Sequence, residues 1–290
     1  MKIRTFQINS AYLYLAPAFC ILTLIIILPI FGTLYNSFFR DISFINREFH
    51  GITNYVQLLK EPGFWQAVRF TIAFIIVSIP IELGLGILIA QLLNVQSVFQ
   101  MVLRSVILIP WAIPQAISAR VWELIYNYSF GFANIFLLKI GLISEPINWL
   151  GSSHGAFWSI VLTDVWKTVP FVTIIILMGL QTIGTEIKEQ AQIDGANIWQ
   201  IFWYIILPIL KPVILVALIF RTIDALRVFD VVFVLTGGGP GGTTNSLSLY
   251  AYQYFLNGDF GFGSTISVVL FIIAFVLSLI YVSILHHHAK

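Results

Sequence analysis

Residues 189–208 read EQAQIDGANIWQIFWYIILP, and their pattern decides how the rest of the chain is interpreted. Ala191 and Gly195 lie four residues apart, so on a helix they would share one face, and their small size would let another surface approach closely. Pro208 has no backbone donor and disfavours helix in the residue before it, so we expect this helix to end near Leu207. The stretch therefore predicts a short docking helix, a turn and the entry to a membrane span.

The predicted docking helix has a polar side and an apolar side. Glu189, Gln192 and Asn197 supply the polar groups, and the apolar side comes from Ile187, Ile198 and Phe202. An ordinary helix at a membrane surface would also be amphipathic, so this division by itself leaves both interpretations open.

The spacing of these residues resembles the pattern of a known family. Permease subunits of ATP-binding-cassette importers carry E-A-A, three residues, Gly, nine residues and I-x-L-P in a cytoplasmic loop, and here only Gln190 departs from that pattern. The resemblance implies that a coupling loop at 183–206 and the two residues after it contact an ATPase through the following residues: Glu189, Ala191, Asp194, Gly195, Ala196, Ile205, Leu207 and Pro208.

Composition indicates the class of protein independently of that motif. The chain has 290 residues, of which 59% are hydrophobic and 10% charged, whereas a soluble globular domain carries about 25% charged residues. A formal net charge of +2 gives no reason to expect nucleic acid as a partner. Cys20 is the single cysteine, which excludes an intramolecular disulfide and a cysteine metal site. The sequence predicts a polytopic membrane protein, with neither metal nor catalytic residues.

Apolar runs of about 20 residues or more predict an all-α chain with six transmembrane helices. We expect the spans at 11–36, 67–93, 102–126, 157–182, 207–235 and 263–285, within a single permease domain over residues 1–290. A cleaved signal peptide is the competing interpretation of the first span, but its Ala16-Pro17-Ala18 stretch is followed by more apolar chain.

The loops between the spans carry less information. The loop at 127–156 is expected to hold a short interfacial helix around residues 134–139. The glycine-rich run from Thr236 to Thr244 lacks the lysine and the preceding strand of a phosphate-binding loop, so a flexible turn is expected there. Two strings, GITNYVQLLKEPGFW at 51–65 and TGGGPGGTTNSLSLYAY at 236–252, also resemble sugar-importer permeases.

Six spans place both termini on the same side of the membrane. The positive-inside rule only leans towards a cytoplasmic amino terminus, because the two sets of basic residues are nearly equal in number: Lys2, Arg4, Arg104, Lys188, Lys211 and Lys290 against Arg40, Arg47, Lys60 and Lys139. The family resemblance implies the same orientation, because it places the loop between the fourth and fifth spans in the cytoplasm.

Prolines and ionisable residues within the spans predict a polar interior. Helix breaks survive in membranes where neighbouring helices or a cavity satisfy the freed backbone groups, so prolines in the spans fit a moving bundle as well as simple packing kinks. Eight prolines fall in or beside the spans: Pro17, Pro29, Pro80, Pro110, Pro114, Pro170, Pro208 and Pro212. A charge at the centre of a span costs about 2.5–3.5 kcal/mol on insertion scales, so we expect these residues to face inward and pair: Glu82, Arg120, Glu123, Asp164, Lys167, Arg221, Asp224, Arg227 and Asp230. The last four recur every three residues, which is compatible with structural pairing and with lining a translocation path.

Aromatic residues near the outer halves of the third and fourth spans suggest the solute. Sugars pack their C–H faces on rings while their hydroxyls need polar partners, so rings beside balanced charges favour a neutral sugar or sugar-polyol of disaccharide size. The expected substrate path comprises Trp122, Tyr126, Asp164, Trp166, Lys167, Arg221, Asp224, Arg227 and Asp230. A glycerol-phosphate importer is the alternative, and a stand-alone secondary transporter is a further one.

The resemblance also implies an assembly. A chain of this kind would sit in a bacterial or archaeal plasma membrane with a second, usually different, permease subunit, two ATPase subunits and an extracytoplasmic solute-binding protein. ATP and Mg would bind to the ATPase subunits, so this chain would be neither an enzyme nor a carrier of its own cofactor.

Overall fold

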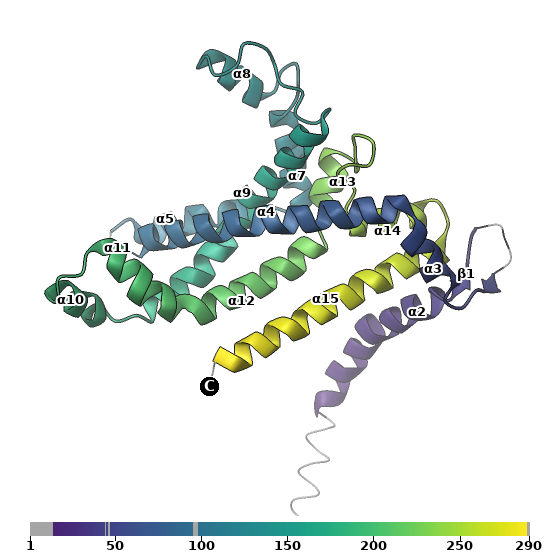
Figure 1. Cartoon of the computed structure of the whole chain (residues 1–290), viewed down its shortest axis with the longest axis horizontal. Helices are drawn as coiled ribbons and strands as arrows, with labels where there is room; N and C mark the ends of the chain where they lie inside the picture. Colours follow the sequence, from purple (N-terminus) through teal and green to yellow (C-terminus); the bar gives the residue numbers. More distant parts are fainter. Residues whose placement is uncertain (1–13, 44, 46, 95–97, 289–290) are drawn as a thin grey trace, which may run out of the picture. The chain divides into compact units, whose positions relative to one another are not determined.

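The computed structural model describes residues 14–43, 45, 47–94 and 98–288, and it confirms the all-α prediction (Figure 1). Five helices are long and apolar enough to cross a membrane, at Tyr14–Asn36, Pro62–Leu93, Ser153–Gln181, Ile198–Leu226 and Phe260–Ile284. A sixth span is possible if the bent pair Gln100–Ala112 and Gln115–Ile125 is counted as one crossing. Residues 11–13 of the first expected span lie outside the described residues.

The chain divides into two compact units. The first unit comprises the residues up to Glu61 together with Tyr250–Phe271. It contains a π-helical turn, η1 (Thr23–Ile27), then α2 (Leu28–Asn36), the strands β1 (Phe39–Arg40) and β2 (Glu48–Phe49), and α3 (Thr53–Lys60). The strands pair antiparallel, with Phe39 opposite Phe49. The prediction of a single permease domain is not decided by this division.

The second unit comprises Pro62–Leu249 and the residues from Ile272 onward. Its helices are α4 (Pro62–Leu93), α5 (Gln100–Ile107), α6 (Ile109–Ala112), α7 (Gln115–Ile125), α8 (Phe132–Lys139), α9 (Ser153–Gln181), α10 (Thr185–Ile193), α11 (Ile198–Ile201), the π-helical turn η2 (Phe202–Ile206), α12 (Leu207–Leu226) and α13 (Asp230–Leu235). Two further helices, α14 (Leu247–Leu256) and α15 (Phe260–His288), continue from one unit into the other.

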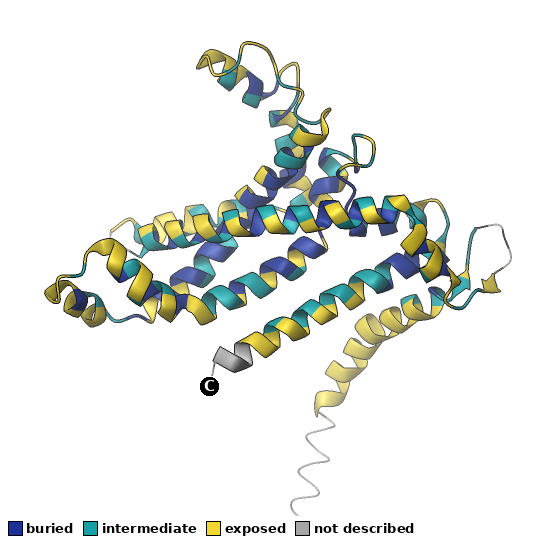
Figure 2. Cartoon of the chain, viewed as in Figure 1, coloured by how far each residue is buried: buried dark blue, intermediate teal, exposed yellow. Residues whose placement is uncertain are grey.

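Helix α9 is the central helix of the second unit (Figure 2). In its most apolar stretch 72% of the residues are buried, against 28% for α4 and 22% for the helix that contains α12. Small residues allow the close packing, as is usual between membrane helices. A Cβ atom added to Gly86 of α4 would lie 2.5 Å from Val172 of α9, and one added to Gly179 of α9 would lie 2.9 Å from Leu210 of α12. The core therefore lies where α4 and α12 pack on α9.

The third span is broken rather than continuous, which corrects the expectation of one helix over 102–126. Helix α6 ends at Ala112, Ile113 and Pro114 are extended, and α7 then departs at 90°. Pro114 has no N–H to continue the helix and disfavours helical conformation at Ile113, which explains the place of the break.

The fifth span, in contrast to the third, is continuous where a break was expected. The predicted helix end near Leu207 is wrong, because α11, η2 and α12 form one helix from Ile198 to Leu226. In η2 the N–H of Leu207 bonds to Phe202 five residues back, and this wide turn gives the ring of Pro208 room against the preceding carbonyls. The same arrangement precedes Pro29, where Leu28 bonds to Thr23. The helix ends before Arg227, so the predicted span at 207–235 is displaced towards the amino terminus.

The glycine-rich loop is packed and hydrogen-bonded, which corrects the expectation of a flexible turn. Thr244 and Ser246 are buried, and their hydroxyls donate to the carbonyls of Gly239 (2.6 Å) and Val228 (2.7 Å). Gly237, Gly238, Gly241 and Gly242 all adopt positive φ, which lets the chain fold back on itself here.

The predicted interfacial helix within 127–156 is present as α8. Its buried Asn134 holds the surrounding loop, because its side chain accepts hydrogen bonds from Ile147 N–H (3.1 Å) and Trp149 Nε1 (2.9 Å) and donates to Tyr128 O (3.2 Å) and Ile147 O (3.0 Å). One buried amide thus fixes both ends of this loop.

Candidate functional site

The expected coupling segment is formed by α10, a tight turn and α11. Gly195 follows α10 with φ of +84°, and its N–H bonds to Gln192 O at 3.0 Å while Ala196 N–H bonds to Ala191 O at 2.9 Å. These two bonds form a Schellman motif, in which glycine at this place lets the chain leave the helix. Gly195 therefore does not share a helical face with Ala191, which corrects the expectation for the docking helix.

Ala191 faces this chain's own core rather than an outside surface. It is 8% exposed and belongs to a cluster that joins α4, α9, α10, α11 and α12: Ala90, Leu93, Val172, Ile176, Leu177, Leu180, Ile183, Ala191, Ile201, Ile206 and Leu210. The close approach that the small side chain permits is therefore an intramolecular one. It anchors the coupling segment to the membrane helices.

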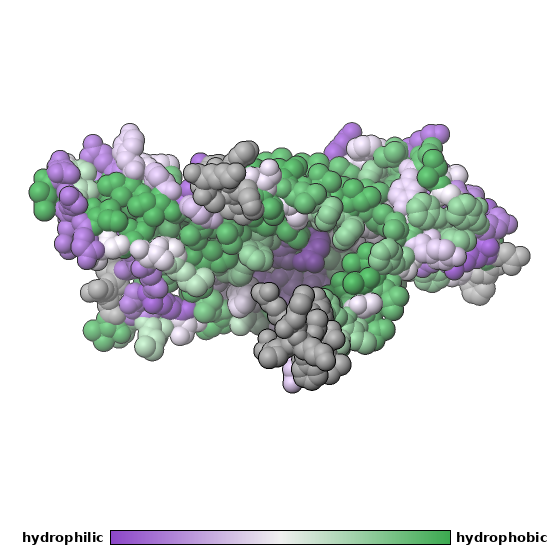
Figure 3. Space-filling view, turned by 90° about the horizontal axis from the view of Figure 1, so that it is seen from below, coloured by the Kyte–Doolittle hydropathy of each residue, from purple (hydrophilic) through white to green (hydrophobic). Residues whose placement is uncertain are grey.

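The outer surface of the coupling segment is grooved, and it carries polar side chains as well as exposed apolar ones, among them Ile193, Ile198 and Trp199. Helix α11 begins with a capping box, in which Asn197 accepts from Gln200 N–H at 2.9 Å and Gln200 accepts from Asn197 N–H at 2.8 Å. A groove of about 290 Å³ is lined by Asp194, Gly195, Ala196, Gln200, Tyr204 and Ile205. Glu189, Asp194 and Pro208 are exposed, whereas Ile205 and Leu207 are half-buried. Figure 3 shows hydrophilic side chains gathered at the end of the second unit where α10 lies.

A buried ion network joins the three central helices. Arg221 of α12 donates to both carboxylate oxygens of Glu82 on α4, at 2.5 and 2.9 Å. It also donates to Asp164 of α9 at 2.8 Å and to Asp224 at 2.9 Å. Glu82, Asp164 and Arg221 are buried. The expected pairing of charges inside the bundle is confirmed for these groups.

The network continues to the surface through Asp224. This side chain is 62% exposed, and its second oxygen lies 3.5 Å from Arg227. The predicted alternation of charges along the fifth span thus holds for Arg221, Asp224 and Arg227. It does not extend to Asp230, because the helix ends before Arg227 and Asp230 begins the separate helix α13.

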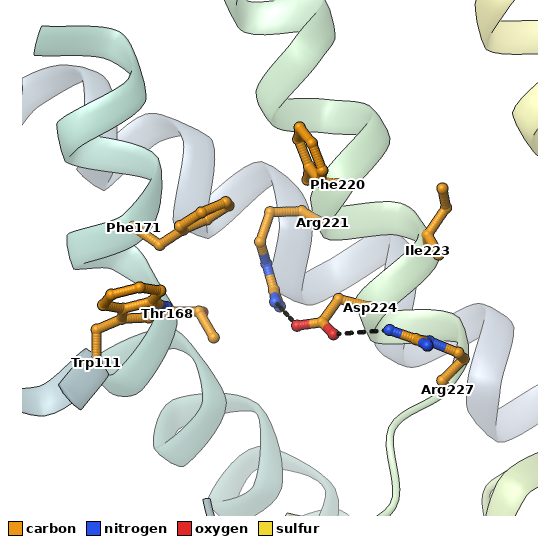
Figure 4. A pocket seen from close by; sticks show the side chains of 8 residues that line it. All are labelled: Trp111, Thr168, Phe171, Phe220, Arg221, Ile223, Asp224 and Arg227. Carbon is orange, nitrogen blue, oxygen red and sulfur yellow. Dashed lines mark hydrogen bonds and ion pairs between the residues drawn. The ribbon is translucent and has the colours of Figure 1, made fainter. Parts of the chain in front are cut away.

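Two cavities border this network. The first, of about 420 Å³, has Trp111, Thr168 and Phe171 on one side, facing residues of α12 that include Phe220, Arg221 and Asp224 and the adjoining Arg227 (Figure 4). The second, of about 280 Å³, shares Arg221, Asp224 and Arg227 and adds polar groups from three further helices, namely Gln115, Asp164 and Asp230. Both cavities therefore lie along the same stretch of α12, and aromatic and charged side chains line them.

Lys167 of α9 was expected on the substrate path and to pair with an acid, but it is bound to backbone. Its ammonium donates to the carbonyls of Pro110, Trp111 and Ile113, at 3.4, 3.1 and 2.6 Å. These carbonyls lie at the break between α6 and α7, and Lys167 lines neither of the two cavities.

The aromatic residues predicted for the substrate path contact one another. Trp122 of α7 lies 5.6 Å from Trp166 of α9 and 5.3 Å from Tyr126 between ring centroids, so the third and fourth spans do meet there. These rings line neither cavity, and nearby the exposed Arg120 pairs with the half-buried Glu123 at 2.6 Å.

The substrate path predicted from the sequence leaves out three aromatic residues that line the first cavity, although Trp111 was among the aromatic residues noted near the outer halves of the spans. Phe171 and Phe220 contact each other at 6.2 Å, and Phe171 stacks on Trp111 at 5.8 Å. Phe171 and Phe220 are ordinary apolar residues of their spans, so nothing local marked them. Trp111 lies between Pro110 and Pro114, which was the available signal. Among the described residues, no group of three or more His, Cys, Asp or Glu side chains is arranged to hold a metal.

Comparison with known proteins identifies the family. The family described as "Binding-protein-dependent transport system inner membrane component" matches residues 82–290. The chain belongs to this family. It is therefore the membrane-spanning transport subunit of a binding-protein-dependent importer and not itself an enzyme, because ATP hydrolysis takes place on separate subunits. The alternative of a stand-alone secondary transporter is thereby wrong.

Relatives match nearly the whole chain. The trehalose/maltose transport system permease protein MalF of Thermococcus litoralis is 46% identical, over 98% of this chain and 96% of that one. The sulfoquinovosyl glycerol transport system permease protein SmoG of Agrobacterium fabrum is 39% identical, over 95% and 90%. A crystal structure of a bacterial ABC transporter involved in the import of the acidic polysaccharide alginate covers 100% of both chains, with a TM-score of 0.86 and 23% identity. This last likeness shows the fold alone.

The first prediction concerns the buried network. Arg221→Met leaves Glu82 and Asp164 buried without their cation, so we expect a loss of about 3–5 kcal/mol of stability. Arg227→Met removes an exposed pair and is the matched control, with an expected loss of about 0–1 kcal/mol. Thermal unfolding of the purified protein in detergent measures both. Equal losses for the two variants would contradict the assignment of Arg221 as the central cation.

Proposed function

We propose that this chain is one of two permease subunits of an importer that moves a neutral sugar of disaccharide size into the cell. The observation that carries the proposal is the cavity beside α12, where Trp111 and Phe171 face Phe220 and the charged groups of that helix (Figure 4). Rings offer stacking surfaces for the C–H faces of a sugar, and its hydroxyls need hydrogen-bonding partners. The volume of about 420 Å³ lies within the range of about 300–1,000 Å³ that is usual for small-molecule sites.

The charges at the cavity favour a neutral cargo over an anionic one. The guanidinium of Arg221 is already bound to three carboxylates, and Arg227 lies beside Asp224. Lys167 is bound to carbonyls. A phosphorylated cargo would need cations that are not already neutralised. The exposed Asp224 carboxylate can instead accept hydrogen bonds from sugar hydroxyls, and the name of the trehalose/maltose relative agrees with such a cargo.

The rest of the importer is proposed from the family resemblance. A second permease subunit, of a different sequence, would complete the path, and two ATPase subunits would bind ATP and Mg and dock on the coupling segment. An extracytoplasmic solute-binding protein would deliver the sugar. A solved relative of the same fold is described in complex with a periplasmic protein, as this arrangement requires.

The geometry suggests how the ATPase cycle would reach the cavity. One continuous helix runs from Ile198 in the coupling segment to Leu226, and it carries Arg221. At 1.5 Å per residue, Ile198 and Arg221 are about 35 Å apart along its axis. Because Ala191 of α10 packs in the apolar cluster that includes residues of this helix and of α9, a displacement of the coupling segment would move the charged end of α12 with it. Such motion fits a switch between inward-facing and outward-facing states.

The second prediction concerns orientation in the membrane. We expect both termini and Glu189 to lie in the cytoplasm and the loop at 236–246 to lie outside the cell. Cys20 is first replaced by Ala, and single cysteines are placed at Glu189 or Thr243, which are both exposed. Asn245 would be a poor choice because it is buried. In intact cells an impermeant thiol reagent is expected to label position 243 and not 189. The reverse result would overturn the orientation and the coupling segment together.

The third prediction tests docking at Gly195. An asparagine tolerates positive φ, so Gly195→Asn adds a side chain with little backbone strain. Gly141 is the matched control, because it also has positive φ (+72°), caps α8 with the same pair of bonds, and like Gly195 has no described atom within 4 Å of an added Cβ. We expect Gly195→Asn to abolish most uptake and Gly141→Asn to retain it.

The level of the permease in the membrane is the control for that comparison. Normal uptake by Gly195→Asn, with the ATPase subunits still bound, would mean that docking does not use this turn.

The fourth prediction tests the cargo directly. The complete importer is reconstituted in lipid vesicles with its binding protein, and solute-stimulated ATP hydrolysis and uptake are measured for neutral disaccharides, glycerol phosphate and amino acids. We expect stimulation by a neutral disaccharide. Stimulation by a phosphate ester or an amino acid, but by no neutral glycoside, would contradict the proposal.

A further inference from the structure

The break in the third span leaves backbone carbonyls that the helix itself cannot satisfy. In a continuous helix the carbonyl of Pro110 would accept from the residue four ahead, but that residue is Pro114, which has no N–H. The extended conformations of Ile113 and Pro114 also separate the carbonyls of Trp111 and Ile113 from the first turn of α7. In a membrane such groups must be satisfied by the protein, because lipid offers no donor.

Lys167 supplies the missing donors. Its ammonium has three protons, and it lies within hydrogen-bond distance of three carbonyls, Pro110 (3.4 Å), Trp111 (3.1 Å) and Ile113 (2.6 Å). The side chain is 7% exposed and comes from α9, the most buried helix. The backbone carbonyls that Lys167 binds thus explain why a charged side chain lies within the membrane-spanning part of the chain.

The other side of the break is held by the same face of α9. Asp164 lies three residues before Lys167, close to it on the helix surface. It accepts from Gln115, the first residue of α7, at 3.3 Å, and from Arg221 at 2.8 Å. One turn of α9 therefore binds the end of α6 and the start of α7.

The backbone that Lys167 holds also carries a wall of the cavity. The ring of Trp111 lines the first cavity opposite Asp224 and Arg227, stacked on Phe171 (Figure 4). We propose that Lys167 is a positioning residue for the cargo: by clamping the carbonyls at the break, it holds Trp111 where the sugar is bound, without contacting the sugar. This inference rests on the proposed function for the identity of the cargo. The clamp, meaning the three hydrogen bonds from Lys167 to the carbonyls at the break, does not depend on it.

Graded substitutions test the affinity for cargo. Lys167→Met removes all three donors, Lys167→Gln keeps two, and Lys167→Arg keeps the charge and its donors. Lys211→Met makes the same change at an exposed lysine of α12 and is the matched control. The importer carrying each variant is purified without its binding protein to measure the dissociation constant of the cargo, and it is reconstituted with the binding protein to measure the maximal rate of uptake.

We expect Lys167→Met to raise the dissociation constant of the cargo tenfold or more while the maximal rate of uptake changes less than threefold. Lys167→Gln should lie between Lys167→Met and the unmodified protein, and Lys167→Arg and Lys211→Met should stay within threefold of the unmodified protein. If Lys167→Met does not assemble, the comparison of Lys167→Gln with Lys167→Arg decides. A dissociation constant of the cargo that is unchanged in Lys167→Gln and in any assembled Lys167→Met would overturn the proposal.

A second readout does not depend on the cargo. Spin labels are attached to cysteines at Ile109 of α6 and Leu162 of α9, both exposed, after Cys20→Ala. Electron paramagnetic resonance should give one narrow distance distribution for the unmodified protein and for Lys167→Arg, and a broader one for Lys167→Gln and Lys167→Met. An unchanged distribution in these last two variants would overturn the clamp even if uptake falls. If no neutral sugar is transported but the distribution broadens, the proposed function fails and the clamp stands.

Discussion

The guanidinium of Arg221 is the group on which the packing of the central helices depends. It is bound by carboxylates from α4 and α9 and by a third on its own helix, and two of these carboxylates are buried with it. An unpaired charge in this setting is costly, so the three helices must stay close enough for the ions to remain paired. Asp224 belongs to the same ion network and faces the cavity. The contacts of Arg221 therefore determine both how the helices pack and what shape the cavity has.

Helix α9 connects this ion network to the rest of the second unit. Asp164 joins it to Arg221, Lys167 joins it to the broken third span, and Phe171 lines the cavity. Its other end enters the apolar cluster that holds α10 and α11. The coupling segment and the cavity are thus attached to the same buried helix, as a transport subunit driven from outside its own chain requires.

Much of the fold could be predicted because it depends on local patterns. The lengths of the apolar runs predicted the approximate spans. The spacing of the coupling motif and of Arg221, Asp224 and Arg227 indicated the coupling segment and the charged helix. The pairing of Glu82 with Arg221 could not be predicted, because the two residues are 139 positions apart and only packing brings them together. Asp194-Gly195 after a helix could have been interpreted as a helix end, and Pro110 with Pro114 as a break, had those local rules been preferred over apolar length. The π-helical turn at Pro208 had no sequence signal of its own, since proline more often ends a helix than widens it.

A double-mutant cycle between Glu82 and Arg221 tests the central claim most directly. The unfolding midpoints of Glu82→Gln, Arg221→Met and the double variant are measured in the same detergent, and the interaction energy is taken from their differences. If Arg221 joins α4 to α9 and α12 through Glu82, the double variant is less destabilised than the sum of the single variants, by about 1–3 kcal/mol. Additive losses would contradict the account, because they would mean that the two residues act independently.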